Sequence, residues 1–559
     1  MKRLTMTVLA LFTAATLNAQ VEDDWAKKMK EEQNNALKEF EQFTQQAIQE
    51  YENFRKQANE EYARFMEEAW KLFEAQPEEE PPMKPKPHVP MVVGPTPSPE
   101  PVPAPEPKPT PKPVPVPEPV PSPNTVPVTN PVSEPDRIQA PDPVPVPNPV
   151  PAPDPDVIMM TEPVRIPDPI VSPLLSKPDL NEKPERPQPM EPIVPSAIPM
   201  TAAQNVFLYG SPFAFHLESE TTLELKDASE KSVAKMWKQL SDPSYDHVIA
   251  ECLQQREKKN LCDWAYIQLT QQVAEKHLGK GTNEAVVMQM YLLTQSGYQM
   301  RIGRDNANKL MLLIGSKEKI FRYRYFVLNG VKFYIMDRKF NGKGLHIFDH
   351  AFPKEKSLSL LMTQPDLKVE KTEKRTITSK RYPEVSITVQ TNRNLIDFYN
   401  DYPINFNWNY YSLASISPVL KESLYPALRK AIEGKSDLEA ANILLNFVQT
   451  GFKYQTDDEQ FGYERPLYPD ESFFYPYCDC EDRSILFSCL VRELLGLDVV
   501  LLDYPEHIAT AICFKQPVNG DYLVMDGKNY IISDPTYIGA RVGECAPKYK
   551  TIRPNLIRF

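Results

Sequence analysis

Glycine, histidine and long hydrophobic runs are scarce in this 559-residue sequence. It contains 18 Gly and 7 His, and no stretch after the first residues approaches the ~20 apolar residues that cross a membrane. Its net charge is −12, yet residues 201–559 hold 44 acidic and 44 basic side chains. This balance leaves the folded part without the basic surface that nucleic-acid-binding proteins need. We therefore expect neither a nucleic-acid partner nor a transmembrane span once the first residues are removed.

Proline is abundant, but it is nearly confined to one segment. Residues 77–200 contain 43 of the 59 prolines, a distribution that excludes one compact fold for the whole chain. Each proline fixes φ and removes a hydrogen-bond donor, and it pushes the preceding residue toward extended geometry. The pattern predicts a Pro-rich, disordered and semi-rigid linker over 77–200 in polyproline II conformation. Recognition of PxxP-like stretches by another domain is the alternative, and no feature of the sequence supports it.

Residues 1–19 have the layout of a secretory signal peptide. Lys2 and Arg3 precede an apolar run over 6–17 that is too short to span a bilayer, and Ala19 offers a cleavage position. Because Leu17 departs from the small-residue pattern of cleavage sites, retention as an uncleaved anchor stays open. The sequence predicts an exported protein of the periplasm or cell envelope.

Residues 20–76 are expected to form one long helix. Positions 22–75 contain no Gly or Pro and are rich in helix-forming Glu, Gln, Lys and Ala. Aromatic side chains recur at steps of eleven residues, in the rows Phe40, Tyr51, Tyr62, Phe73 and Phe43, Phe54, Phe65. Eleven residues complete three helical turns, so these rows stay on one face. We predict that helix 22–75 self-associates through this face or docks on an envelope partner.

A second helix is predicted to begin beside a cysteine. Apolar residues at helical spacing follow Cys480, and Gly496 is typical of a helix end. Asp479 and Asp482 have the spacing of a capping box, which places Cys480 in the first turn. The positive end of a helix dipole stabilises a thiolate, so we expect a lowered pKa for this thiol.

One histidine and one aspartate complete a candidate catalytic set. His507 is the single histidine after Cys480, and an alternating, strand-like run begins at this residue. A hairpin is predicted over 522–533 with the turn pair Asp526-Gly527, and Asp534 follows at the strand end before Pro535. Cysteine, histidine and aspartate in these places supply a nucleophile, its base and the group that orients the base.

At these residues the sequence resembles the transglutaminase-like family of cysteine enzymes. The matching motifs are Asp479-Cys480-Glu481-Asp482, His507, and Asp534-Pro535-Thr536, within a region of similarity over roughly 430–559. The resemblance implies a papain-like α/β core in which a helix packs on an antiparallel sheet, and a catalytic triad of Cys480, His507 and Asp534. It also implies a bacterial exported member of the family. Cys478 departs from the family pattern, which usually has glycine there.

Simpler structural roles for these residues remain open. Cys480 could pair in a disulfide with Cys478, Cys489 or Cys513, because the expected compartment is oxidising. His507 could be a strand histidine with a satisfied hydrogen bond, and Asp534 could cap a turn. The other cysteines, Cys252, Cys262 and Cys545, cannot be paired from sequence. A zinc site is disfavoured because Cys478 and Cys480 lack a second ligand pair at the usual spacing, so we predict no metal and no cofactor.

Residues 263–340 repeat the pattern of the candidate catalytic region without its chemistry. Asn283 stands where Cys480 stands later, and 54 positions separate it from Asp337, as 54 separate Cys480 from Asp534. We hypothesise an internal duplication in which Lys309 or a neighbour replaces the histidine. The expected organisation is a degenerate domain over 201–375 and a catalytic domain over 376–559.

The expected chemistry is covalent acyl transfer from a peptide or protein amide to Cys480. Water as the second substrate gives a protease or amidase, and an amine gives a cross-linking enzyme. Hydrolysis is the preferred prediction, because the sequence identifies no amine-binding site. The alternative is a non-catalytic envelope adaptor or binding module with the same fold.

Overall fold

A computed structural model describes residues 2–83, 85–93, 162–170, 186–195, 202–217 and 223–559. The side chains of 2–27, 29, 31–33, 36 and 41 lie outside this description, as does most of the predicted linker. The prediction of a signal peptide over 1–19 therefore stays untested. The chain divides into two units, of which one comprises residues 1–93 and 163–559 and the other comprises 94–162. The features below belong to the first unit.

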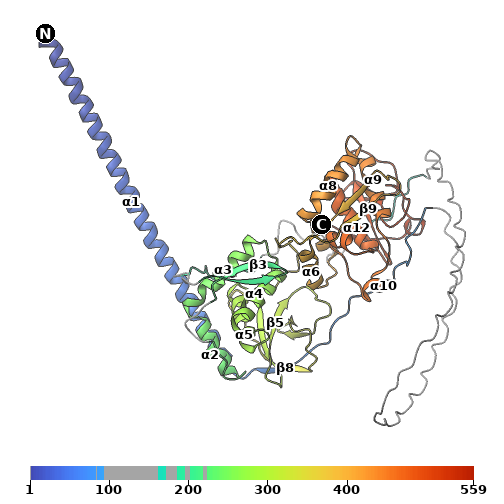
Figure 1. Ribbon diagram of the computed structural model, residues 1–559, viewed down its shortest axis with the longest axis horizontal. Helices are drawn as coiled ribbons and strands as arrows, with labels where there is room; N and C mark the ends of the chain where they lie inside the picture. Colours follow the sequence, from blue (N-terminus) through green and yellow to red (C-terminus); the bar gives the residue numbers. More distant parts are fainter. Residues whose placement is uncertain (1, 84, 94–161, 171–185, 196–201, 218–222) are drawn as a thin grey trace, which may run out of the picture. The chain divides into compact units, whose positions relative to one another are not determined.

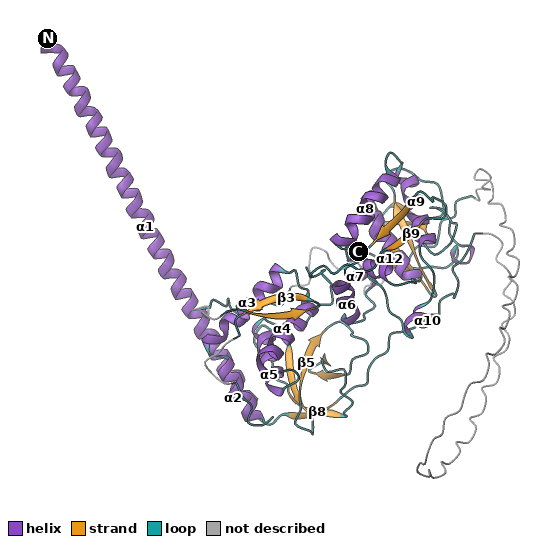
Figure 2. Ribbon diagram, in the orientation of Figure 1, coloured by secondary structure: helices purple, strands orange, loops and turns teal. Residues whose placement is uncertain are grey.

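The fold is mixed α/β, as predicted, with 38% helix and 20% strand. Figure 2 shows helices and strands interspersed along the described chain. All strand pairs within the sheets are antiparallel. Among the described residues, no helix combines the length and hydropathy needed to cross a membrane.

The predicted N-terminal helix is present, but its end differs from the expected one. Helix α1 spans Lys2–Met66 as one continuous element (Figure 1), and residues Lys71–Glu74 form strand β1 instead of a further helical turn. The expected end near residue 75 is therefore wrong. Backbone pairing of β1 with another strand overrides the helix propensity of this stretch, which the sequence composition alone does not reveal.

The aromatic face of α1 divides into a buried and an exposed part. Tyr62 is 2% exposed, and its ring lies 5.0 Å from the Trp237 ring, 5.0 Å from Phe348 and 5.1 Å from Phe352, centroid to centroid. Phe40 and Phe43 are 67% and 71% exposed. The C-terminal end of the stripe thus packs against its own chain. The prediction of an external partner stays open for the rest.

The first sheet has the strand order β1-β8-β4-β5-β7-β6. Its strands after β1 are β4 (Met300–Arg304), β5 (Leu310–Ser316), β6 (Tyr325–Leu328), β7 (Val331–Ile335) and β8 (Gly344–Phe348). The other elements of this half of the chain are β2 (Gln204–Leu208), β3 (Ser211–Phe215), α2 (Glu230–Leu240), a 3-10 turn (Pro243–Tyr245), α3 (Asp246–Lys258), α4 (Asp263–Leu278) and α5 (Asn283–Gln295). Helix α5 packs on β4 and β5.

The second sheet has the order β13-β14-β12-β11-β15. Its strands are β11 (Asp498–Tyr504), β12 (His507–Cys513), β13 (Tyr522–Met525), β14 (Lys528–Ser533) and β15 (Asn555–Ile557). The elements that precede it are β9 (Arg375–Thr378), β10 (Ser386–Val389), α6 (Arg393–Asp401), α7 (Trp408–Leu413), α8 (Pro418–Ile432), α9 (Asp437–Gly451), α10 (Asp457–Phe461), α11 (Pro469–Phe474) and α12 (Cys480–Leu490). A π-helical turn (Val491–Leu495) ends α12, and a 3-10 turn (Pro547–Tyr549) precedes β15.

The two sheets repeat one topology. Helix α5 precedes β4 to β8 as α12 precedes β11 to β15, and β8-β4-β5-β7-β6 has the same order as β15-β11-β12-β14-β13. In each case one further segment contacts both edge strands. Residues 71–76 contact β8 and β6, and residues 165–170 contact β13 and β15. This shared arrangement supports the hypothesis of an internal duplication.

The described ends of the Pro-rich segment lie against the folded chain. The Arg322 N–H donates to the Glu79 carbonyl oxygen at 2.9 Å, Val92 bridges to Ile538, and Ile170 bridges to Asn555. Arg256 donates to the carbonyl oxygen of Pro187 at 2.9 Å. At these described residues the finding differs from the expected disordered linker over 77–200. Proline leaves its own carbonyl and the neighbouring N–H groups able to pair, so a Pro-rich composition does not prevent docking.

The packing of α1 predicts a large difference between two aromatic truncations. Tyr62→Ala leaves a cavity beside three buried rings, so we expect it to lower the free energy of unfolding by about 3–5 kcal/mol. Phe40→Ala removes a ring that is 67% exposed and is expected to change it by less than about 0.5 kcal/mol. Urea unfolding followed by tryptophan fluorescence measures both values. Equal effects of the two substitutions would contradict the docking of α1.

Candidate active site

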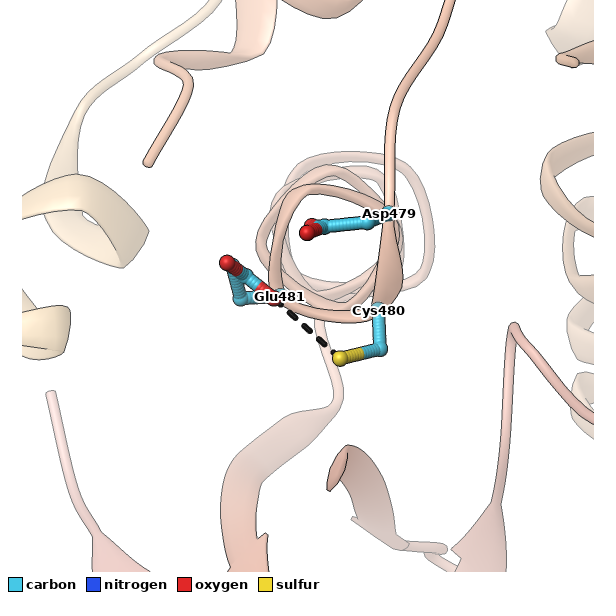
Figure 3. A group of neighbouring side chains, drawn as sticks. All are labelled: Asp479, Cys480 and Glu481. Atoms are coloured by element: carbon cyan, nitrogen blue, oxygen red, sulfur yellow. Dashed lines mark hydrogen bonds between the residues drawn. The ribbon is translucent and has the colours of Figure 1, made fainter. Parts of the chain in front are cut away.

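The candidate nucleophile begins helix α12, as the sequence predicted. Asp479 is the N-cap residue in extended conformation, and its backbone N–H donates to Asp482 Oδ2 at 3.2 Å. The other oxygen of Asp482 accepts from the backbone N–H of Leu467 at 2.8 Å. Figure 3 shows Asp479, Cys480 and Glu481 around the first turn. The capping arrangement fixes the direction in which these three side chains leave the helix.

The thiol of Cys480 is completely buried. Its exposed fraction is 0%, and Sγ donates to Glu481 Oε2 at 3.1 Å, the contact drawn in Figure 3. The backbone N–H of Ile508, the residue after His507, also interacts with the sulfur. All seven cysteines of the chain are free thiols, so Cys480 is not held in a disulfide.

His507 and Asp534 form a buried pair. His507 is the first residue of β12, Asp534 follows the last residue of β14, and His507 Nε2 lies 2.8 Å from Asp534 Oδ2. Asp534 Oδ1 accepts from the backbone N–H groups of Thr536 and Tyr537 at 2.8 and 3.1 Å. The carboxylate is therefore fixed by its own turn, and it orients the imidazole.

Two residues that the sequence did not single out support this pair. The ring of Tyr549 stacks on the imidazole of His507, with centroids 5.0 Å apart and planes 9° apart. Gln449 of α9 donates through Nε2 to the carbonyl oxygens of Asp534, Tyr537 and Ala540 at 2.8–3.0 Å. No local motif marks either residue, since both contacts join distant parts of the chain.

The three predicted site residues therefore meet in one region. Cys480 contacts the residue after His507, and Tyr549 interacts electrostatically with both Cys480 and Asp534. Within the described part of the chain, no hydrogen bond joins Cys480 to His507, and His507 Nδ1 is buried without a hydrogen-bond partner. The imidazole thus keeps one nitrogen free for a proton, while the thiol is bonded to Glu481.

Five buried carboxyl groups surround the start of α12. They are Asp457, Glu464, Asp479, Glu481 and Asp482, each at most 2% exposed. Burial and the charge of Asp479 raise the pKa of Asp482 to about 8. Burial and the charge of Glu481 raise the pKa of Asp479 to about 7. Like charges in low dielectric resist ionisation, so this cluster strongly favours a cation among its members.

Lys86, from the Pro-rich segment, supplies that cation. Its Nζ lies 2.7 Å from Glu464 Oε1, 2.8 Å from Asp479 Oδ2 and 4.0 Å from Asp457 Oδ2, and it also contacts Glu481 Oε1. The side chain is 4% exposed. Burial lowers the pKa of Lys86, but the charges of Asp479, Glu481 and Asp457 outweigh burial and hold it well above the usual range. Lys86 is therefore a buried ammonium ion.

The expected lowering of the thiol pKa is wrong for this arrangement. Burial raises the pKa of Cys480 well above its usual range, and the charges of Glu481 and Asp479 raise it further. Lys86 and the Ile508 N–H act in the opposite direction but do not compensate. A helix N-terminus contributes only partial charge, which full carboxylate charges on the adjacent residues outweigh.

The same donor atoms have the spacing of metal ligands. Three sets lie within 4.8 Å: Asp479, Cys480 and Glu481; Asp457, Glu464 and Glu481; and Asp457, Asp479 and Asp482. Oxygen-rich sets of this kind suit a divalent cation. The Lys86 ammonium lies among these oxygens. It provides the positive charge that a bound cation would otherwise supply.

Residues of a different chemical type occupy the corresponding positions near the first sheet. Asn283 is the first residue of α5, as Cys480 is of α12, and its Oδ1 accepts from the Leu310 N–H at 2.9 Å. Lys309 precedes β5, and its Nζ lies 2.5 Å from Asp337 Oδ2. The contacts Asn283–Leu310 and Lys309–Asp337 thus correspond to Cys480–Ile508 and His507–Asp534. An amide in place of the thiol cannot act as a nucleophile, as the sequence predicted.

Sequence reasoning missed the acidic cluster and its lysine. Asp457 and Glu464 lie in a stretch where acidic residues are typical of a solvated surface, and Lys86 stands between two prolines in a repetitive segment.

In comparisons with known proteins, no family model, curated protein or solved structure matches the chain. The assignment of this site therefore depends on its own geometry and on the motif resemblance.

The raised pKa of Asp482 predicts a pH-dependent stability. Asp482 keeps its proton in the folded state up to about pH 8 and loses it near pH ~4 when unfolded, so unfolding becomes easier as pH rises through this range. We expect Asp482→Asn to reduce the fall in unfolding free energy between about pH 5 and about pH 8 by roughly 2 kcal/mol or more.

Urea unfolding at both pH values measures this change. Asp366→Asn is the matched control, because Asp366 is 67% exposed and its substitution should leave the pH profile unchanged. A wild-type stability that is equal at both pH values would show that the cluster is not protonated in the folded state.

Proposed function

We propose that the chain is a cysteine-dependent amide hydrolase or acyltransferase with a transglutaminase-like, papain-like core. Cys480 is the nucleophile, His507 the general base and acid, and Asp534 the orienting carboxylate. The observation that carries the proposal is the buried His507–Asp534 pair, whose imidazole keeps Nδ1 free beside the residue that contacts the Cys480 sulfur. A nucleophile, its base and an orienting group within reach of one another define this class of site.

The proposed reaction has two steps. His507 Nδ1 takes the thiol proton as Cys480 Sγ attacks the amide carbonyl carbon, and the backbone N–H of Cys480 stabilises the oxyanion. The C–N bond then breaks, His507 returns the proton to the departing amine, and a thioester remains. In the second step His507 takes a proton from water, and the hydroxide attacks the thioester carbonyl carbon. The C–S bond breaks, His507 returns the proton to the sulfur, and the thiol and a carboxylic acid are released.

Hydrolysis remains the preferred outcome over cross-linking. An acyl acceptor amine must be unprotonated to attack the thioester, because only the free amine has a lone pair. The amine that contacts the carboxylates beside Cys480 is Lys86, and its neighbours hold its pKa above the usual range. A group that is kept as ammonium is a binding contact and not a nucleophile. Peptide or protein amides are the proposed substrates, and the exported address implied by residues 1–19 suggests targets in the cell envelope.

A second candidate function is a non-catalytic adaptor. The complete burial of the Cys480 sulfur and its raised pKa favour this alternative, because a reactive thiol needs access and thiolate character. The intact His507–Asp534 pair argues against it, since the corresponding positions in the first sheet have lost the imidazole.

Alkylation of Cys480 by iodoacetamide at mildly acidic pH separates the two functions. We expect His507→Ala to slow modification of Cys480 by at least about 10-fold, because the imidazole no longer accepts the thiol proton. Peptide mass spectrometry quantifies each cysteine, and Cys480→Ala confirms the assignment. The partly exposed Cys513 serves as an internal reference in every sample.

His216→Ala is the matched control, because this histidine also pairs with a carboxylate, Glu251, but belongs to the N-terminal half of the chain. Burial of the thiol slows alkylation of Cys480 in the wild type and in each variant alike. The measured quantity is therefore the ratio of the Cys480 alkylation rates in the wild type and in His507→Ala. Cys480 modification that is indifferent to His507 would favour the adaptor.

A further inference from the structure

Residues 85–93 contact the candidate active site at two points. The Val93 N–H donates to the Ile538 carbonyl at 2.9 Å, and the Ile538 N–H donates to the Met91 carbonyl at 2.6 Å. Ile538 lies four residues after Asp534. At the other end, Lys86 reaches the carboxylates beside Cys480. The segment is thus held by backbone pairing near one triad residue and by ion pairs near another.

Lys86 contacts three carboxylates of the cluster. Its ammonium group donates hydrogen bonds to Asp479 Oδ2 and Glu481 Oε1, and it forms an ion pair with Glu464 Oε1 at 2.7 Å. Pro85 and Pro87 flank the lysine and need no partners for N–H groups. A lysine of a solvated spacer would keep its ammonium in water, since burying an ion is costly unless it is paired. Pairing with these carboxylates therefore offsets the cost of burying the ammonium group.

We propose that Asp457, Glu464, Asp479 and Glu481 form a subsite for the lysine ammonium of an extended polypeptide, and that Lys86 occupies this subsite within its own chain. The subsite lies directly beside Cys480, because Asp479 and Glu481 are its neighbours in sequence and Glu481 accepts the thiol hydrogen bond. In this arrangement the Cys480 thiol is 0% exposed. An incoming chain with a lysine must replace Lys86 to reach it.

The binding part of this inference is independent of the proposed function, and the substrate part rests on it. If the chain is a hydrolase, its substrates carry a lysine next to the reacting amide. Because the occupant is tethered, its effective concentration is on the order of mM, so a free peptide competes poorly while Lys86 is in place. Removal of the Lys86 charge is therefore the step that exposes the subsite.

Lysine reactivity in the full wild-type chain tests the occupancy. With a limiting amount of an acetylating reagent, we expect Lys86 to react at least about 10-fold more slowly than Lys71, whose side chain is 69% exposed. In the variant Glu464→Gln/Glu481→Gln, the protection of Lys86 should be lost while Lys71 is unchanged. Equal reactivity of Lys86 and Lys71 in the wild type would overturn the proposal.

Peptide binding tests the specificity of the subsite. The probe is a fluorescent synthetic peptide with the sequence of residues 85–93, and its match has norleucine in place of the lysine. We expect the full-length Lys86→Gln chain to bind the lysine peptide at least about 10-fold more tightly than the norleucine peptide, the ratio that one charge-assisted hydrogen bond supplies. The wild type and the control Lys71→Gln should bind neither peptide measurably.

Equal affinity of Lys86→Gln for both peptides, or affinity for neither, would overturn the subsite, provided that circular dichroism shows a folded chain. If Lys86→Gln does not fold, Lys86→Met keeps the apolar stem and replaces it in the measurement. Neither readout uses the Cys480 thiol, and both can be repeated in Cys480→Ala. Failure of the proposed hydrolase function is thus distinguishable from failure of this inference.

Discussion

The ion pairs between one lysine and the carboxylates at the start of α12 are the interaction on which the described site depends. Asp479 and Asp482 shape the first turn of the helix, Glu481 accepts a hydrogen bond from the Cys480 thiol, and Asp457 and Glu464 complete the group of carboxylates around Lys86. Five buried acids at such short distances would repel one another if they were ionised without a counter-charge. Lys86 provides that charge, so the local fold around Cys480 includes a residue that lies 393 positions before Asp479 in the chain.

The repeated topology allows the site in the second sheet to be compared with the corresponding positions of the first sheet. Both sheets present a helix start, a residue that begins or precedes a strand, and an aspartate after the next hairpin at corresponding positions. In the first sheet these positions hold an amide and a lysine–aspartate pair that is largely solvated, with Lys309 51% exposed. In the second they hold a thiol and a histidine–aspartate pair with a fully buried imidazole. The strand order is common to both sheets. Burial of the histidine–aspartate pair distinguishes the second sheet from the first.

Much of the fold near the site could be predicted, because its signals are local. The capping pattern at Asp479, the strand start at His507 and the positive-φ turn at Asp526 and Gly527 depend on neighbouring residues only. The sign of the Cys480 pKa shift could not be predicted, since it results from burial and from charges assembled by tertiary contacts. The predicted end of the N-terminal helix was wrong for the same reason. Residues 71–74 acquire their conformation from a partner strand, β8, that lies far away in sequence.

The pairing at Ile538 has a consequence for how occupancy and catalysis communicate. The backbone that grips Met91 and Val93 belongs to the turn whose amides hold the Asp534 carboxylate, and Gln449 braces the same turn from α9. By thermodynamic linkage, a change that stabilises this turn also strengthens its backbone pairing with Met91 and Val93. Loss of that pairing destabilises the turn. The turn that pairs with residues 91–93 is therefore the same turn that fixes the Asp534 carboxylate beside the imidazole.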